Sequence, residues 1–154
     1  VFPAIRRELP HAEFRIVGRH TESVESLGEL PGVTVAGSVE SLQPELERAD
    51  VSVVPLRSGA GTRLKVVEAM ANRLPVVSTA IGCEGIDVSD GVHLLVAEDA
   101  AAFARSCIRA VSDASLRADL IAAAEARYLE TYQWSTIRER VAALADQVSE
   151  RLRS

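Results

Sequence analysis

Two positive side chains lie at the beginning of a predicted helix. Arg63 and Lys65 follow a loop with two glycines, and the spacing of apolar residues predicts a helix over 63–73, with Thr62 as its cap. The first turn of a helix carries unpaired N–H groups and the positive end of the dipole, so each cation there costs about 0.3–1 kcal/mol. We therefore predict a bound anion, because a glycine loop that runs into a helix is a common cradle for phosphate.

Glu68 lies one turn further along the same predicted helix. Its carboxylate could accept hydrogen bonds from two neighbouring hydroxyls, as an acidic residue does with ribose in other nucleotide sites. The alternative is a simple surface pair with Lys65, which would contribute only a few tenths of a kcal/mol. Other phosphate motifs are absent from the sequence: there is no GxxxxGK[ST], and Gly18-Arg19 is not followed by the glycines of a dinucleotide fingerprint.

Composition excludes several classes of protein. The 154 residues fit one domain, and 47% apolar with 25% charged residues is typical of a globular chain. A net charge of −5 argues against nucleic acid as a partner, and no apolar run reaches the ~20 residues of a transmembrane helix. Cys83 and Cys107 lie far apart without metal-ligand spacing, so we expect no metal site and a reduced, cytoplasmic protein.

Short β-branched runs alternate with helical patterns along the chain. This alternation predicts an α/β fold, with a Rossmann-like parallel sheet, helices on both faces and a helical C-terminal part. Glycines follow the first four strands, at the carboxyl ends where open parallel sheets bind ligands. The predicted strands are 13–17, 33–35, 51–54, 75–78 and 94–96, and the predicted helices are 1–9, 22–30, 41–49, 63–73, 99–112, 115–128 and 134–153.

The order of these motifs resembles a known family. Residues 55–71, 74–79, 82–86 and 90–96, with matches upstream from Phe14 and downstream to Trp134, resemble the C-terminal domain of group 1 glycosyltransferases of the GT-B fold. The resemblance implies a donor-binding domain over 1–154 that holds a nucleotide-diphospho-sugar. It further implies metal-independent, retaining transfer of a hexosyl group without a cofactor, of the kind used in polysaccharide biosynthesis, to a sugar or glycan acceptor.

The resemblance also implies a role for each matched residue. Arg63 and Lys65 would contact the donor diphosphate and stabilise the departing nucleoside diphosphate as the catalytic cations. Glu68 matches the second acidic residue of the family's E-x7-E motif and would bind the ribose. Gly18 with Arg19 would line the donor side of the crevice, and Gly61 and Thr62 would offer their backbone N–H groups.

The chain departs from the family pattern in two places. Ala60 stands where the first acidic residue of E-x7-E would be, which leaves the contact to the donor sugar unassigned. The family's first strand and its acceptor-binding N-terminal domain have no counterpart, so we expect a fragment of a longer enzyme that is inactive alone. The full-length enzyme could associate with a membrane. Because that strand is internal to the family's sheet, its absence would open a backbone edge to self-association.

Two other functions stay open at this point. Ala60 favours a non-catalytic interaction module on the same fold, whereas a GT-B-type sugar-nucleotide epimerase would need acid/base groups, for which His20 and Glu84 are the candidates.

Trp134 is expected to pack in the core, as large aromatic residues usually do. If the last helix instead reaches toward the absent domain, its apolar face would be exposed, at Ala142, Leu144, Ala145, Val148 and Leu152.

Overall fold

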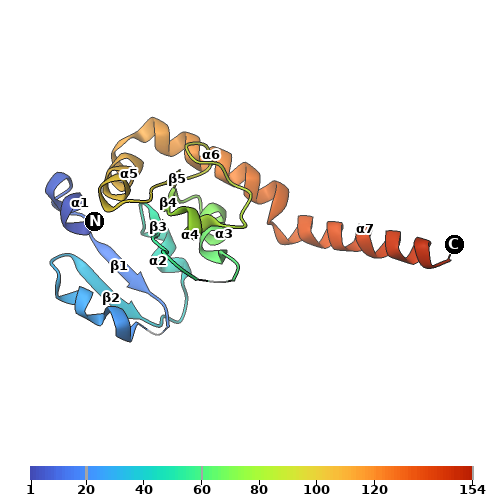
Figure 1. Cartoon of the computed structure of the whole chain (residues 1–154), viewed down its shortest axis with the longest axis horizontal. Coiled ribbons are helices and arrows are strands. Elements are labelled where there is room, and N and C mark those ends of the chain that lie inside the picture. Colours follow the sequence, from blue (N-terminus) through green and yellow to red (C-terminus); the bar gives the residue numbers. More distant parts are fainter. Residues whose placement is uncertain (20, 60, 154) are drawn as a thin grey trace.

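The computed structural model describes residues 1–19, 21–59 and 61–153. Parallel strands form two sheets in this structure (Figure 1). The predicted α/β class is therefore confirmed, but the single sheet is wrong. The two-stranded sheet contains β1 (Phe14–Val17) and β2 (Val33–Gly37), and the three-stranded sheet has the order β3 (Ser52–Val54), β4 (Val76–Ser78) and β5 (Leu95–Val96).

Helices connect the strands and then make up the C-terminal part of the chain. Most of their bounds lie within three residues of the predicted ones. Residues 22–29 form a 3-10 helix, and a short helix after β4 was not predicted. The helical elements are α1 (Phe2–Glu8), η1 (Glu22–Glu29), α2 (Gln43–Glu47), α3 (Leu64–Ala71), α4 (Ala80–Cys83), α5 (Ala100–Ser112), α6 (Ala114–Thr131) and α7 (Trp134–Arg153).

Helices cover both faces of the three-stranded sheet, as the sequence pattern predicts. Neighbouring residues of a strand point to opposite faces, and Val76 and Val77 of β4 accordingly belong to two separate apolar clusters. Val76 packs with α3 and α6, including the buried Met70, whereas Val77 packs with α5, including the buried Phe103. All three residues of β4 are buried, because this strand lies between two others and between two helical layers.

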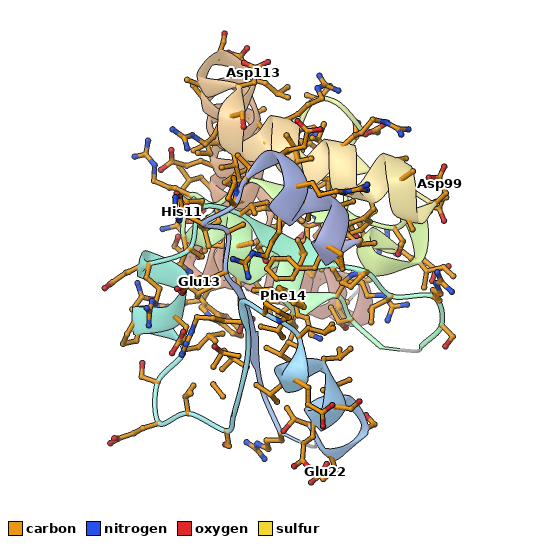
Figure 2. All side chains as sticks on the ribbon, turned by 90° about the vertical axis from the view of Figure 1, so that its left-hand side faces the viewer. His11, Glu13, Phe14, Glu22, Asp99 and Asp113 are labelled. Atoms are coloured by element: carbon orange, nitrogen blue, oxygen red, sulfur yellow. The ribbon has the colours of Figure 1, made fainter. Side chains whose placement is uncertain are left out.

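The two-stranded sheet is attached to the rest through side chains. The Arg15 guanidinium of β1 donates two hydrogen bonds to the Glu45 carboxylate of α2, at 2.7 and 2.9 Å. The rings of Phe2 and Phe14 lie 5.7 Å apart and join β1 to α1, which packs against α5 where that helix runs between Asp99 and Asp113 (Figure 2). In the described residues no ladder joins β1 to β3, so each keeps one unpaired backbone edge.

The last helix extends away from the body of the molecule. Figure 1 shows α7 continuing beyond the end of α6, with only its first turns near other elements. Trp134 is 76% exposed, so the prediction that it packs in the core is wrong. Leu144 and Val148 are also exposed, together with Ala142 and Ala145, as expected for a helix whose apolar face has no partner within the described residues. The side chain of Leu152, the fifth residue of that expectation, lies outside the described part.

Candidate functional site

The candidate site is built from a loop and the beginning of α3. We use "glycine loop" for residues 55–63, which connect β3 to α3 and include Ala60, outside the described residues. The helix begins at Leu64, and Arg63 occupies the capping position without a side-chain cap, so the prediction of Thr62 as the cap is wrong by one residue. Gly59 and Gly61 have φ values of 142° and 95°, a backbone region that favours glycine.

Lys65 is an exposed cation of this site, as is Arg57 in the glycine loop. Lys65 lies in the first turn of α3, and it is the only lysine of the chain. Its side chain forms no ion pair or hydrogen bond within the described residues. Glu68 is exposed and likewise has no side-chain partner there, so the simple surface pair of Lys65 with Glu68 is not formed.

Arg63 occupies a different environment. Its side chain is only 5% exposed, and it donates from Nε to the carbonyl of Ile81 at 2.8 Å and from Nη2 to the carbonyl of Gly59 at 3.0 Å. The Glu84 carboxylate lies 3.5 Å from Nη2. Contrary to the prediction, Arg63 therefore does not need an external anion, because a carboxylate of the chain itself lies beside it. Sequence spacing could not reveal this pair, which joins residues 21 positions apart.

The carboxyl ends of β3 and β4 meet beneath the glycine loop. The Thr79 hydroxyl donates to the carbonyl of Leu56 and accepts from the N–H of Gly82 at 3.0 Å, which caps α4. The buried Ser78 hydroxyl donates to the carbonyl of Val54 at 3.3 Å. Thr79 is a functional neighbour that the sequence reasoning missed, although a threonine directly after a buried strand is a common signal for a helix cap.

Gly82 explains why α4 can lie so close to the strand ends. A Cβ atom at this position would fall 2.4 Å from the Ser78 hydroxyl oxygen and 2.4 Å from the carbonyl oxygen of Val54. The sequence analysis counts Gly82 among the glycines that follow strands at the edge where open parallel sheets bind ligands. The structure places it inside a buried helical turn, where the absence of a side chain permits close packing.

The remaining predicted residues lie in separate places. Gly18 follows β1 with a φ of 152°, and Arg19 beside it is exposed; no hydrogen bond or ion pair joins Arg19 to the glycine loop in the described part of the chain. Gly61 and Thr62 are exposed, and their N–H groups donate to no described residue. Their amides thus remain available to a ligand.

The structure describes one of the two acid/base candidates for an epimerase. Glu84 is 73% exposed and faces the Arg63 guanidinium, and His20 lies outside the described residues.

Metal and thiol chemistry receive no support from the described residues. No three His, Cys, Asp or Glu side chains among them are grouped to hold a metal ion. Burial raises the pKa of the Cys83 thiol and raises that of Cys107 to about 12, so both thiols are protonated near neutral pH. A protonated thiol is a poor nucleophile and a poor metal ligand.

Fold and site together define a Rossmann-like α/β domain with a glycine loop at the carboxyl end of its parallel strands. A sequence model described as "Glycosyl transferases group 1" matches residues 1–113. The chain belongs to this family. It is also 32% identical over 117 residues to an uncharacterized 44.6 kDa protein in the cps region of Klebsiella pneumoniae. This alignment covers 70% of this chain but only 30% of the relative's length.

Solved structures of glycosyltransferases share the fold. Sucrose-phosphate synthase from Thermosynechococcus elongatus superposes with a TM-score of 0.78 at 23% identity, over 97% of this chain and 42% of the other. TarM from S. aureus, in complex with UDP among other ligands, superposes with a TM-score of 0.72 at 22% identity. The match covers 92% of this chain and 30% of TarM. HepE from Anabaena, with UDP and glucose bound, superposes with a TM-score of 0.72 at 16% identity, over 94% of this chain and 44% of HepE. The GT-B class of the fold is thereby confirmed.

None of the helices that the structure describes combines the length and the apolar character needed to cross a bilayer.

Proposed function

We propose that this chain binds the nucleotide-diphospho-sugar donor of a glycosyltransferase, with the diphosphate at the first turn of α3. The single observation that carries the proposal is Lys65: an exposed cation at the positive end of a helix dipole, beside the amides of Gly61 and Thr62, none of which has a partner among the residues that the structure describes. Such a cation is unfavourable in the free protein and becomes favourable when an anion binds. UDP in the TarM and HepE complexes supports a uridine nucleotide as the first ligand to test.

The neighbouring groups have complementary parts in this proposal. The N–H groups of Gly61 and Thr62 donate to phosphate oxygens, and the Glu68 carboxylate, one turn from Lys65, accepts from the ribose hydroxyls. Gly18 and Arg19 approach the donor from the end of β1. In the full reaction Lys65 stabilises the negative charge that develops on the leaving nucleoside diphosphate.

Chemical footprinting tests the site directly, because Lys65 is the only lysine. The chain is acylated with an N-hydroxysuccinimide ester with and without UDP, and the modified residues are counted by mass spectrometry. UDP should protect Lys65 and leave the N-terminal amine of Val1, the internal control, equally reactive. Equal acylation of Lys65 with and without saturating UDP would contradict the proposed site.

Calorimetric titration then separates donors and metal dependence. UDP, GDP and ADP are compared with and without Mg²⁺, with Lys65→Gln as the test variant and Arg105→Gln, an exposed position on α5, as its matched control. Saturable binding that persists in EDTA and weakens only in the Lys65 variant supports a metal-independent donor site. Failure of all three nucleotides to bind the folded chain would overturn the proposal.

The whole reaction belongs to a longer protein in this proposal. The chain spans 30% of the curated relative's length, and transfer requires an acceptor held against the donor in a defined geometry. We propose that the acceptor is a sugar or glycan bound outside these residues, that transfer retains anomeric configuration, and that the isolated chain binds without efficient turnover. The cytoplasmic location expected from the reduced cysteines is part of the same proposal.

Self-association through the open strand edges completes the proposal. The edges of β1 and β3 that carry no ladder offer unpaired N–H and C=O groups, which can pair with another molecule. Light scattering over a concentration series should show a mass that rises above that of one chain. A single 16.5 kDa species at every concentration would contradict this part.

A further inference from the structure

Arg63 and Lys65, the two basic residues at the start of α3, have separable tasks. We propose that Arg63 is a positioning residue that fixes the glycine loop to α4, and that it acts on the ligand only through the loop. This inference refines the proposed function and rests on it for its effect on binding, but the fixing of the loop is independent of any ligand.

The hydrogen bonds of Arg63 join two segments that are distant in sequence. Nε donates to the carbonyl of Ile81 in α4, and Nη2 donates to the carbonyl of Gly59 in the loop. The guanidinium is planar with donors in a rigid fork, so these two bonds fix the loop and α4 relative to one another. A lysine ammonium is a point charge on a flexible stem and cannot reproduce this geometry.

Burial indicates that Arg63 serves the fold around it before any ligand. Its side chain is 5% exposed, whereas a buried guanidinium is tolerated only with hydrogen bonds and a counter-charge. The two carbonyls supply the hydrogen bonds, and Glu84 at 3.5 Å supplies the counter-charge. Since the Glu84 side chain is 73% exposed, water screens this pair, and the carbonyls rather than the carboxylate hold the guanidinium in place.

A second contact anchors the other end of the loop. Thr79 donates to the carbonyl of Leu56 and accepts from Gly82, so the start of the loop is also joined to α4. The segment between these anchors contains Gly61 and Thr62, whose amides have no described partner. Arg63 therefore limits where these amides can lie, while the exposed Lys65 supplies the charge.

Hydrogen exchange of the ligand-free chain is the first test. Arg63→Lys keeps the charge and loses the fork, and Lys65→Met is the matched control. We expect the hydrogen-bonded amides of Gly82 and Glu84, in and directly after α4, to exchange about tenfold faster in Arg63→Lys, since hydrogen bonds from a charged group are lost, and at the parental rate in Lys65→Met. Parental exchange in Arg63→Lys would overturn the positioning role, whether or not any nucleotide binds.

The salt dependence of UDP binding is the second test and reports a property that loop order alone does not change. A cation in contact with phosphate makes affinity fall as salt rises. Lys65→Met should flatten this dependence, whereas Arg63→Met should weaken binding and keep the parental slope. An Arg63→Met slope as flat as that of Lys65→Met would place Arg63 on the phosphate and overturn the inference.

Arg63→Lys should be weakened like Arg63→Met, and full affinity in Arg63→Lys would also overturn the inference. Absence of UDP binding by the parental chain would contradict the proposed function. The hydrogen-exchange result would still decide whether Arg63 positions the glycine loop.

Discussion

At the scale of single residues, the exposed charge of the site and the contacts that position its loop come from two different side chains. Lys65 is exposed and unpaired at the beginning of α3, whereas Arg63, two positions earlier, is buried and bound to two carbonyls. Two basic residues at nearly the same place in sequence are therefore expected to have different functions. The difference lies in their surroundings: Arg63 is buried against the carbonyls of Gly59 and Ile81, whereas Lys65 faces solvent.

Removal of the Lys65 charge should stabilise the free chain. The cation lies at the positive end of the α3 dipole, so Lys65→Gln should raise the free energy of unfolding by about 0.3–1 kcal/mol while it weakens UDP binding. Urea unfolding with and without UDP measures both effects. The Arg105→Gln control, far from a helix terminus, should change neither quantity, and a destabilised Lys65→Gln chain would contradict the dipole argument.

Gly82 should tolerate no side chain. Alanine there would place its Cβ atom 2.4 Å from two oxygen atoms, so we expect Gly82→Ala to lose about 1–3 kcal/mol of stability through overpacking. Gly28→Ala is the matched control, because its Cβ atom would meet only the Val35 side chain at 3.6 Å. Thermal unfolding should separate the two variants, and an equal midpoint for both would show that α4 can move away.

At the scale of elements, the sequence predicted most helices and strands but not how the strands group. Apolar runs such as 75–78 predicted buried strands correctly, because β4 is covered on both faces. Periodicity carries no information on which strands pair, and the single predicted sheet is split between β1 and β3. The helix α4 was missed because it has four residues, too few for a periodic pattern, and contains Gly82.

The position of the candidate site along the chain could be predicted from the sequence, but the contacts of its side chains could not. A loop with Gly59 and Gly61 between a strand and a helix located the site, since both features are local in sequence. The partners of Arg63 are not local: Ile81 and Glu84 come from beyond the next strand. Only the folded chain brings them to the guanidinium, so the sequence assigned Arg63 the same role as Lys65.

The junction of β1 with α2 should be sensitive to acid. The Arg15 guanidinium hydrogen bonds to the Glu45 carboxylate and lowers its pKa below the ordinary 4.5. A lowered pKa means that the pair stabilises the fold above pH about 4.5, and that this contribution is lost as the pH falls through the lower, folded-state value.

Glu45→Gln should therefore be less stable than the parental chain at pH 7 and equal to it at the acid end. Chemical unfolding at a series of pH values measures this difference. Glu47→Gln, an exposed glutamate on the same helix, is the comparison, and a gap between Glu45→Gln and the parental chain that stays constant down to low pH would contradict the assignment.

At the scale of the whole molecule, stability resides in the three-stranded sheet and the helices on its faces. The largest buried side chains, among them Met70, Leu94 and Leu120, all belong to this layer. By contrast, α7 exposes Val141, Leu144 and Val148, each by more than half of its surface. The distal part of α7 thus adds little to the folding of the described chain.

Truncation of α7 tests this division. A chain that ends at Arg140 keeps the bonds of Thr136 to Leu129 and of Arg140 to Glu130, and it should melt within about 2 °C of the full chain. Leu120→Ala, in the buried part of α6, should instead cost about 2–5 kcal/mol. A large loss of thermal stability on truncation would show that the exposed apolar residues of α7 are packed in solution.

The length of α7 has a mechanical consequence. Twenty residues of helix measure about 30 Å, while the hydrogen bonds from Thr136 and Arg140 secure only its first turns. A tilt of about 10° at this pivot would carry the far tip through about 5 Å on that length. The helix is a lever arm, and a spin label at Val148 would magnify small adjustments of its base into a readily measured swing.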